Sequence, residues 1–165
     1  MELTRIIATP VGPMGIAATP HAVTRIFFAP GQPLSAPVPV DGASGGAALL
    51  QRAERELGEY FAGRRRDFTL PLAPAGTPFQ QAVWEALRRI PYGRTCCYRD
   101  IARAIGRPAA CRAVGMANNR NPIVVVIPCH RVVGADGSLT GYAGGLSVKA
   151  RLLEIEQGLS NKSDY

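Results

Sequence analysis

Few side chains in this sequence could hold a metal ion. The 165 residues include two histidines, His21 and His130, and four cysteines, none of them in CxxC spacing. A zinc site built from these side chains is therefore not expected. The cysteines do not predict a disulfide framework either, because adjacent residues such as Cys96 and Cys97 rarely bridge each other and a cytosol keeps thiols reduced.

Long hydrophobic runs are also absent. No apolar stretch approaches the roughly 20 residues that a membrane-spanning helix needs. The N-terminus carries Glu2 and Arg5 and lacks the apolar core of a signal peptide. The composition, 47% hydrophobic and 19% charged, is that of a globular chain with one domain or two small ones. These features predict a cytoplasmic protein without a membrane partner.

Lysine is scarce, and positive charge gathers in the second part of the chain. Seventeen of the nineteen basic residues are arginine. Residues 1–75 hold 7 Lys/Arg against 6 Asp/Glu, a net of +1, whereas residues 76–165 hold 12 against 6, a net of +6. Because arginine suits phosphate geometry, this distribution favours a polyanionic partner such as nucleic acid. A GC-rich coding sequence, which enriches arginine and alanine, is an alternative that composition alone leaves open.

Residues 1–75 predict a small antiparallel sheet with one helix. Turns rich in proline and glycine separate the expected strands, and the apolar residues of the helix recur at helical spacing. A long loop is expected between sheet and helix, and a linker after the last strand. The segments are Leu3–Ala8, Gly15–Thr19 and Ala22–Phe28 (strands), 29–46 (loop), Ala47–Phe61 (helix), Phe68–Leu70 (strand) and 71–76 (linker).

Residues 76–165 predict a mostly helical domain. A first helix is expected from Pro78 to Arg89, capped by Thr77. Next come two short helices, Asp100–Ile105 and Ala109–Asn118, joined by a turn that contains glycine, which is the pattern of a helix-turn-helix.

The second of these two helices is rich in small residues, and Arg112 is its one long cation. Such a surface lets the helix backbone approach DNA closely while reading few base edges, which favours sequence-independent binding. The alternative is that small residues merely permit tight packing between helices.

The tetrapeptide Pro128-Cys129-His130-Arg131 follows an apolar, β-branched run, residues 123–127. The run predicts a buried strand that ends in a cysteine. A buried cysteine is commonly an inert apolar residue. A thiol with an ordinary pKa of about 8.5 needs a base or a cation nearby to become a thiolate, and His130 and Arg131 offer both. Catalysis and packing are both open at this point.

A last helix is predicted over Val148–Gln157, capped by Ser147 and stopped by Gly158. This would place Glu156 at its C-terminal end, where the helix dipole disfavours a carboxylate. Either Glu156 has a specific partner, or it is an ordinary exposed residue.

Four motifs stand in a characteristic order in the second part of the chain. They are Arg112-Ala113-Val114-Gly115, Asn121-Pro122, Ile127-Pro128-Cys129-His130-Arg131-Val132 and Gly141-Tyr142-Ala143-Gly144-Gly145-Leu146. The ordered set resembles the O6-alkylguanine-DNA alkyltransferase family, also called methylated-DNA–protein-cysteine methyltransferases. The resemblance is close from about Phe79 to Glu156 and looser over residues 1–75, where length and the predicted meander agree with the family.

The predicted elements and the resemblance together imply an α+β protein of two domains. Residues 1–75 would form an N-terminal α/β domain of structural role, a small antiparallel sheet with a helix. Residues 76–165 would form a mostly helical domain that binds DNA and transfers the alkyl group. That domain would contain the helix-turn-helix and the buried strand that carries the cysteine.

The resemblance implies direct-reversal DNA repair. Members of the family remove an alkyl group from O6 of guanine, and here also from O4 of thymine, in duplex DNA. They extrude the damaged nucleotide into a pocket, because the target atom is out of reach inside the duplex. The alkyl group remains on the protein as a thioether, so each molecule repairs one lesion. The implied protein is a monomer that needs no cofactor and binds double-stranded DNA containing O6-alkylguanine.

The resemblance also assigns catalytic roles. Cys129 would be the nucleophile and alkyl acceptor, and His130 the base that removes the thiol proton through a water molecule. Glu156 would bind the other imidazole nitrogen, which supplies the partner sought above. Asn121 would fix the turn beneath the site. Tyr98 would donate a proton to the leaving guanine and help to rotate the phosphate.

DNA-binding and pocket residues follow in the same way. Arg112 would fill the gap in the base stack, and the helix surface at Ala113 and Gly115, together with Tyr98, would contact DNA. Each of these side chains also has an ordinary structural alternative, such as a phosphate contact for Arg112 or helix packing for the small residues. The implied guanine pocket is lined by Pro122, Val132, Tyr142, Ala143 and Gly144.

One departure and two alternative functions follow. Relatives often have Ser or Thr before the tyrosine, whereas this chain has Cys97, a poorer helix cap. The first 75 residues hold no cysteine, so a zinc-bound phosphotriester-repair domain is not expected. The alternatives are a DNA-binding module that senses lesions with an inert Cys129, and a cysteine hydrolase that would need a distant histidine such as His21.

Overall fold

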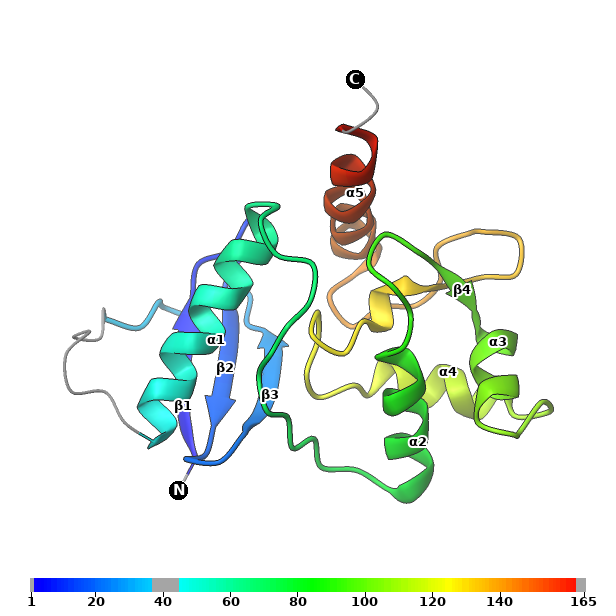
Figure 1. The fold of residues 1–165 in the computed structure, drawn as a ribbon, viewed down its shortest axis with the longest axis horizontal. Helices are drawn as coiled ribbons and strands as arrows, with labels where there is room; N and C mark the ends of the chain where they lie inside the picture. Colours follow the sequence, from blue (N-terminus) through cyan, green and yellow to red (C-terminus); the bar gives the residue numbers. More distant parts are fainter. Residues whose placement is uncertain (1, 37–44, 163–165) are drawn as a thin grey trace. The chain divides into compact units, whose positions relative to one another are not determined.

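The computed structural model describes residues 2–36 and 45–162. The chain forms two compact units, residues 1–75 and 76–165 (Figure 1). The predicted loop over 29–46 lies partly outside the described residues, because 37–44 are not among them. Within the described part, every helix is too short or too polar to cross a membrane.

The first unit is a three-stranded antiparallel sheet with one helix against it. Strands β1 (Leu3–Ile7), β2 (Met14–Ala18) and β3 (Val23–Phe28) lie in the order β1-β2-β3, and helix α1 (Gly45–Phe61) contacts all three (Figure 1). The predicted meander and helix are confirmed. Strand β2 is buried along its whole length. Its Gly15 leaves room for the ring of Phe27, which would lie 2.2 Å from a Cβ atom at that position.

The prediction of a strand over Phe68–Leu70 is wrong. The backbone N–H of Thr69 donates to a carboxylate oxygen of the buried Glu56 at 2.8 Å, so a side chain takes the place of a neighbouring strand. The chain meets β3 just beyond, at an isolated parallel bridge between Val23 and Leu72. Glu56 thereby ties α1 to the segment that leads out of the first unit.

Helix α2 (Pro78–Leu87) opens the second unit and begins as predicted. The hydroxyl of Thr77 accepts from the backbone N–H of Gln80 at 3.1 Å, and the side chain of Gln80 accepts from the backbone N–H of Thr77 at 2.9 Å. This reciprocal pair is a complete capping box. The indole N–H of the buried Trp84 donates to the carbonyl of Ala117 at 2.9 Å, which ties α2 to the helix that carries Ala117.

Helices α3 (Tyr98–Ala104) and α4 (Cys111–Asn119) form the predicted helix pair and pack against each other (Figure 1). Helix α4 begins two residues later than predicted, because the backbone N–H of Ala110 closes a turn onto the carbonyl of Arg107 at 2.9 Å. The start of α3 is capped by Asp100, whose carboxylate accepts from the backbone N–H of Cys97 at 2.9 Å. The cysteine at this position is thus supported by the acidic residue three positions later.

The prediction of a buried strand that carries Cys129 is wrong. The run 123–127 is buried as predicted except at Val126, which is half-buried, but it forms turns held by hydrogen bonds within the run. Val125 has φ of +72°, in the left-handed region that strands do not use. Cys129 instead begins a short 3₁₀ helix, η1 (Cys129–Arg131). The next residues form the two-residue strand β5 (Val132–Val133), which pairs in parallel with β4 (Cys96–Cys97).

Helix α5 (Leu146–Lys162) is longer than predicted. It begins before Ser147 and continues through Gly158, so the first does not cap it and the second does not end it. Glu156 therefore lies inside the helix, and the expectation that it faces the C-terminal dipole is wrong. The buried face of α5 carries two charged residues, Lys149 and Glu156, on either side of Leu152 and Leu153.

Candidate active site

Cys129 is almost fully buried, with 2% of its surface exposed. Burial raises the pKa of its thiol, because a thiolate would lose its solvation, while hydrogen bonds from Asn121 and Tyr142 and the charge of Lys149 act in the opposite direction. Three neighbouring groups therefore favour the thiolate, but burial outweighs them and the thiol keeps its proton at rest. Such a thiol becomes a nucleophile when a nearby base takes its proton.

Asn121 shapes the loop beneath the sulfur. Its Oδ1 accepts from the backbone N–H of Ile123 at 2.9 Å, and its Nδ2 donates to the carbonyl of Ile127 at 2.7 Å. One side chain thus satisfies backbone groups that a sheet would otherwise satisfy, which explains why this β-branched run is not a strand. Asn118 on α4 adds a bond from Nδ2 to the carbonyl of Cys129, at 3.4 Å, and so joins the helix pair to the cysteine.

His130 and Glu156 form a buried pair. The distance from Nε2 of His130 to Oε2 of Glu156 is 2.6 Å, and both side chains are inaccessible to solvent. Burial acts to raise the pKa of Glu156, but hydrogen bonds and charge from His130 and Arg131 outweigh it and hold the pKa at about 2. The carboxylate is therefore ionised and can only accept, so the imidazole proton lies on Nε2.

The protonation state of His130 follows from its surroundings. Burial lowers the pKa of the imidazole, and the neighbouring Arg131 and Lys149 lower it further, while Glu156 acts against them. The ring is neutral near pH 7, with its proton on Nε2 and a lone pair on Nδ1. That Nδ1 atom is buried and has no hydrogen-bond partner among the described residues. The imidazole is ready to accept one proton at this nitrogen.

Arg131 is a site residue that sequence reasoning placed only beside the thiol. It binds Glu156 through two nitrogens, with Nε 2.8 Å from Oε1 and Nη2 3.1 Å from Oε2, and its Nη1 donates to the carbonyl of Ile90 at 2.7 Å. The backbone N–H of Gly93 also donates to Oε1 of Glu156, at 3.2 Å. The carboxylate is thus held from three sides, which orients it toward His130.

Lys149 was missed by sequence reasoning. Its side chain is fully buried, and its Nζ donates to the carbonyl of Thr140 at 2.7 Å. Burial lowers the pKa of this amine, while the nearby Cys129 acts to raise it. The available signal was the spacing of Lys149, Leu152, Leu153 and Glu156, which places all four on one face of a helix.

Tyr98 is joined to the same loop. Its hydroxyl lies 2.8 Å from the hydroxyl of Thr140, and its ring would lie 3.8 Å from a Cβ atom at Gly115 of α4. The structure therefore brings Tyr98, Gly115 and the loop before α5 together. Of the other predicted DNA-contacting residues, Arg112 and Ala113 are exposed on α4.

The predicted pocket residues differ in exposure. Val132 is buried beside Cys96 in the β4–β5 pair, and Tyr142 is half-buried and acts to lower the pKa of Cys129. Pro122 and Gly144 are half-buried, and Ala143 is exposed. His21 lies in an exposed turn of the first unit. Among the described residues, no group of three His, Cys, Asp or Glu side chains could hold a metal ion.

A buried cysteine, with a carboxylate-paired imidazole as its next residue, lies in a basic unit that contains a helix-turn-helix. This combination defines a class, that of DNA-binding proteins with a cysteine nucleophile. Two family profiles match the chain, "6-O-methylguanine DNA methyltransferase, ribonuclease-like domain" over residues 3–74 and "6-O-methylguanine DNA methyltransferase, DNA binding domain" over residues 78–158. The chain belongs to the 6-O-methylguanine DNA methyltransferase family, and the resemblance seen in its motifs is confirmed.

Individual relatives agree with this assignment. The methylated-DNA–protein-cysteine methyltransferase of Methanosarcina barkeri is 47% identical, over 92% of this chain and 95% of the relative. The constitutive one of Bacillus subtilis is 47% identical, over 90% and 92%.

Solved structures show the same α+β fold. The Mycobacterium tuberculosis O6-methylguanine methyltransferase has a TM-score of 0.81 at 42% identity, covering 96% of this chain and 94% of that chain. A structure of the M. tuberculosis protein in complex with DNA has a TM-score of 0.80 at 41% identity, covering 94% and 93%. The predicted fold class is confirmed, apart from the strand at Cys129 corrected above.

Proposed function

We propose that this protein repairs DNA by moving an alkyl group from O6 of guanine, and also from O4 of thymine, in duplex DNA to Sγ of Cys129. The observation that carries the proposal is the geometry around Cys129. A buried thiol is followed by a neutral imidazole whose Nε2 is bound to Glu156, in the unit that carries the helix-turn-helix. The names of the relatives, all methyltransferases that act on methylated DNA, support the same reaction.

The proposed reaction has a simple balance of atoms and electrons. Nδ1 of His130 takes the thiol proton through a water molecule, and Glu156 stabilises the resulting imidazolium. The sulfur of Cys129 then attacks the alkyl carbon, so that an S–C bond forms as the C–O bond breaks. The electron pair of the broken bond stays on the guanine oxygen, and the base regains a proton with Tyr98 as the donor. The proton taken from the thiol then replaces the one that Tyr98 gave up, so guanine and a thioether are the products.

The thioether explains why the proposed protein acts once. A C–S bond in a thioether is stable to hydrolysis, and the proposal includes no step that cleaves it. Each molecule repairs one lesion, without cofactor or metal. It acts as a monomer in the cytoplasm, where its four free cysteines would stay reduced. Residues 1–75 have a structural role in this proposal, and residues 76–165 bind DNA and transfer the alkyl group.

The target atom must leave the duplex before it can react. In the proposal the α4 surface at Ala113 and Gly115 approaches the DNA backbone, and Tyr98 turns the phosphate of the damaged nucleotide. Arg112, exposed on α4, fills the space that this nucleotide leaves. The extruded base lies against Pro122, Val132, Tyr142, Ala143 and Gly144. Unpairing costs a few kcal/mol, and the inserted Arg112 offsets part of it.

Intact mass measurement tests the proposal. Incubation with duplex DNA that contains O6-methylguanine should add one methyl group to the protein, located on Cys129 by peptide mapping. Cys129→Ser should abolish transfer and keep DNA binding, whereas Cys111→Ser, the matched control, should transfer normally. Binding without transfer would support the lesion-sensing module instead. Repeated turnover would support a hydrolase, and a methyl group on Cys96, Cys97 or Cys111 would contradict the assignment of the acceptor.

A further inference from the structure

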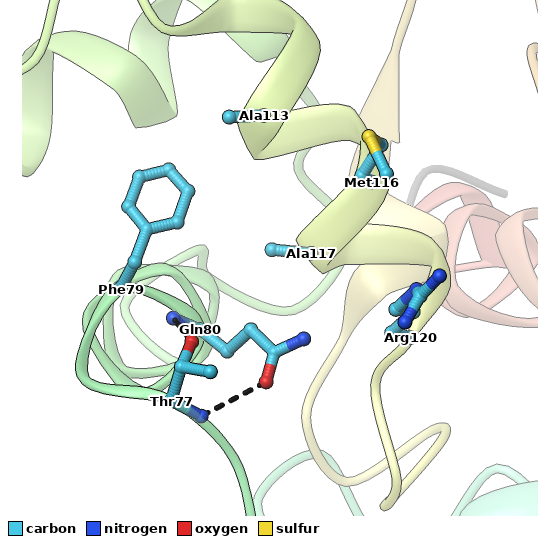
Figure 2. A pocket seen from close by; sticks show the side chains of 7 residues that line it. All are labelled: Thr77, Phe79, Gln80, Ala113, Met116, Ala117 and Arg120. Carbon is cyan, nitrogen blue, oxygen red and sulfur yellow. Dashed lines mark hydrogen bonds between the residues drawn. The ribbon is translucent and has the colours of Figure 1, made fainter.

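A concave feature of the second unit lies away from Cys129. It is a cavity of about 250 Å³ between the first turn of α2 and one face of α4 (Figure 2). None of the residues that surround Cys129 line it. The lining residues are Thr77, Phe79, Gln80, Ala113, Met116, Ala117 and Arg120.

The α4 side of this cavity exposes an unusual side chain. Met116 is 61% exposed, the largest value among the exposed large hydrophobic residues in the described part of the chain. It lies four residues after Arg112 and four before Arg120, so the three side chains follow one side of the helix and its C-terminal cap. Both arginines are exposed. A flexible apolar side chain is therefore presented to solvent between two cations.

The α2 side of the cavity adds the aromatic ring of Phe79 and the side-chain amide of Gln80. Phe79 faces the cavity from α2, and Ala113 and Ala117 face it from α4 (Figure 2). Gln80 uses its Oε1 in the capping box, so the group it can offer to a ligand is its amide N–H₂. Arg120 brings a positive charge, and no acidic side chain is among the described residues that line the cavity.

We infer that this cavity receives one sugar-phosphate unit of the DNA strand that lies along α4. The deoxyribose would pack against Met116 and Phe79, and its phosphate would meet the guanidinium of Arg120 and the amide of Gln80. A wall that is apolar at its centre and cationic at its edge matches this unit, and phosphate contacts of this kind set register without reading sequence. The net charge of +6 on residues 76–165 favours DNA over a second copy of this equally basic chain.

The inference rests on the proposed function, and the salt dependence of binding tests its ionic part. Each phosphate contact contributes about 0.9 to the slope of log Kobs against log salt. Arg120→Ala should lower that slope by about 0.9 on undamaged duplex and weaken binding about tenfold at low salt. Arg151→Ala is the matched control, because Arg151 is an exposed cation of the same unit, on α5. Equal effects of the two variants would overturn the inference.

The apolar part has its own test. Met116→Ala should reduce the ratio of the transfer rate on duplex to the rate on free O6-methylguanine by about fivefold, since several buried carbons are lost. Met116→Leu should preserve the ratio. An unchanged ratio in Met116→Ala, or a change in self-association measured by sedimentation in place of DNA affinity, would overturn the inference. Wild-type protein that fails to take a methyl group from duplex DNA would instead contradict the proposed function.

Discussion

Glu156 accepts hydrogen bonds from His130 and Arg131 at once, and this sets the proton positions in the resting site. We expect His130→Gln to keep the fold and DNA binding and to slow methyl transfer by roughly 10²–10⁴-fold, the range for loss of a general base. Single-turnover transfer from labelled duplex measures this. The wild-type rate should rise with pH, because the thiol proton must leave, and the apparent pKa belongs to the Cys129–His130 pair. Transfer at the wild-type rate in His130→Gln would point to another activating group.

Arg131 makes a geometric contribution that a lysine cannot reproduce. Its planar guanidinium meets both oxygens of Glu156 and also the carbonyl of Ile90. We expect Arg131→Lys to destabilise the second unit by about 3 kcal/mol, since breaking a buried ion pair leaves a poorly compensated charge. Urea unfolding followed by the fluorescence of Trp84, the single tryptophan of the chain, measures this unit alone. An unchanged midpoint would show that one hydrogen bond to Glu156 is enough.

The site residues that the sequence revealed are those whose chemistry is local. Cys129 and His130 are neighbours in the chain, whereas Glu156 drew attention by its place in the predicted last helix and received its partner only through the family resemblance. Lys149 escaped notice because a lysine on a helix is normally solvated, and its burial depends on the loop that supplies the carbonyl of Thr140. Such long-range partners leave no mark on local sequence patterns.

In the proposed function, helix α4 binds DNA through its backbone as much as through its side chains. Arg112 is exposed on it, next to small residues. We expect Arg112→Ala to weaken repair of duplex more than reaction with the free O6-alkylguanine base, because the free base needs no extrusion. Rates on both substrates, measured in parallel, give the comparison. Equal losses on the two would assign Arg112 to the folded structure or the pocket.

Most elements could be predicted because their signals are periodic or lie in residues that are close together in the chain. The helix cap at Thr77 and the turns between β1, β2 and β3 belong to this kind. The prediction of a strand over residues 123–127 was wrong for a definite reason. Its β-branched residues favour a strand, but Asn121 binds the backbone at both ends of the run and Val125 adopts φ of +72°. A side chain outside the run decides its conformation, so composition within the run could not.

At the scale of the whole molecule, buried ionisable groups couple stability to pH. The pKa of Glu156 is lowered to about 2, so its stabilising effect is complete above its unfolded value of 4.5 and is lost as pH falls toward 2. Burial lowers the pKa of His130, so below 6.5 the unfolded chain binds a proton that the folded chain does not. Both effects reduce stability in acid. Urea midpoints reported by Trp84 should therefore fall from pH 7 to pH 3, and Glu156→Gln should flatten the change below pH 4.5.

Thr140 joins two parts of this unit through two different atoms. Its hydroxyl meets Tyr98 at 2.8 Å, and its carbonyl accepts from Lys149 at 2.7 Å. In the proposed function, DNA that binds the hydroxyl of Tyr98 would replace its hydrogen bond to Thr140. That change would reach the loop whose carbonyl holds Lys149 near Cys129. Coupling of this kind is reciprocal by thermodynamic necessity. If bound DNA changes the affinity of the pocket for a free base by some factor, a base in the pocket changes the affinity for DNA by the same factor. Finding a lesion and capturing it are therefore thermodynamically coupled.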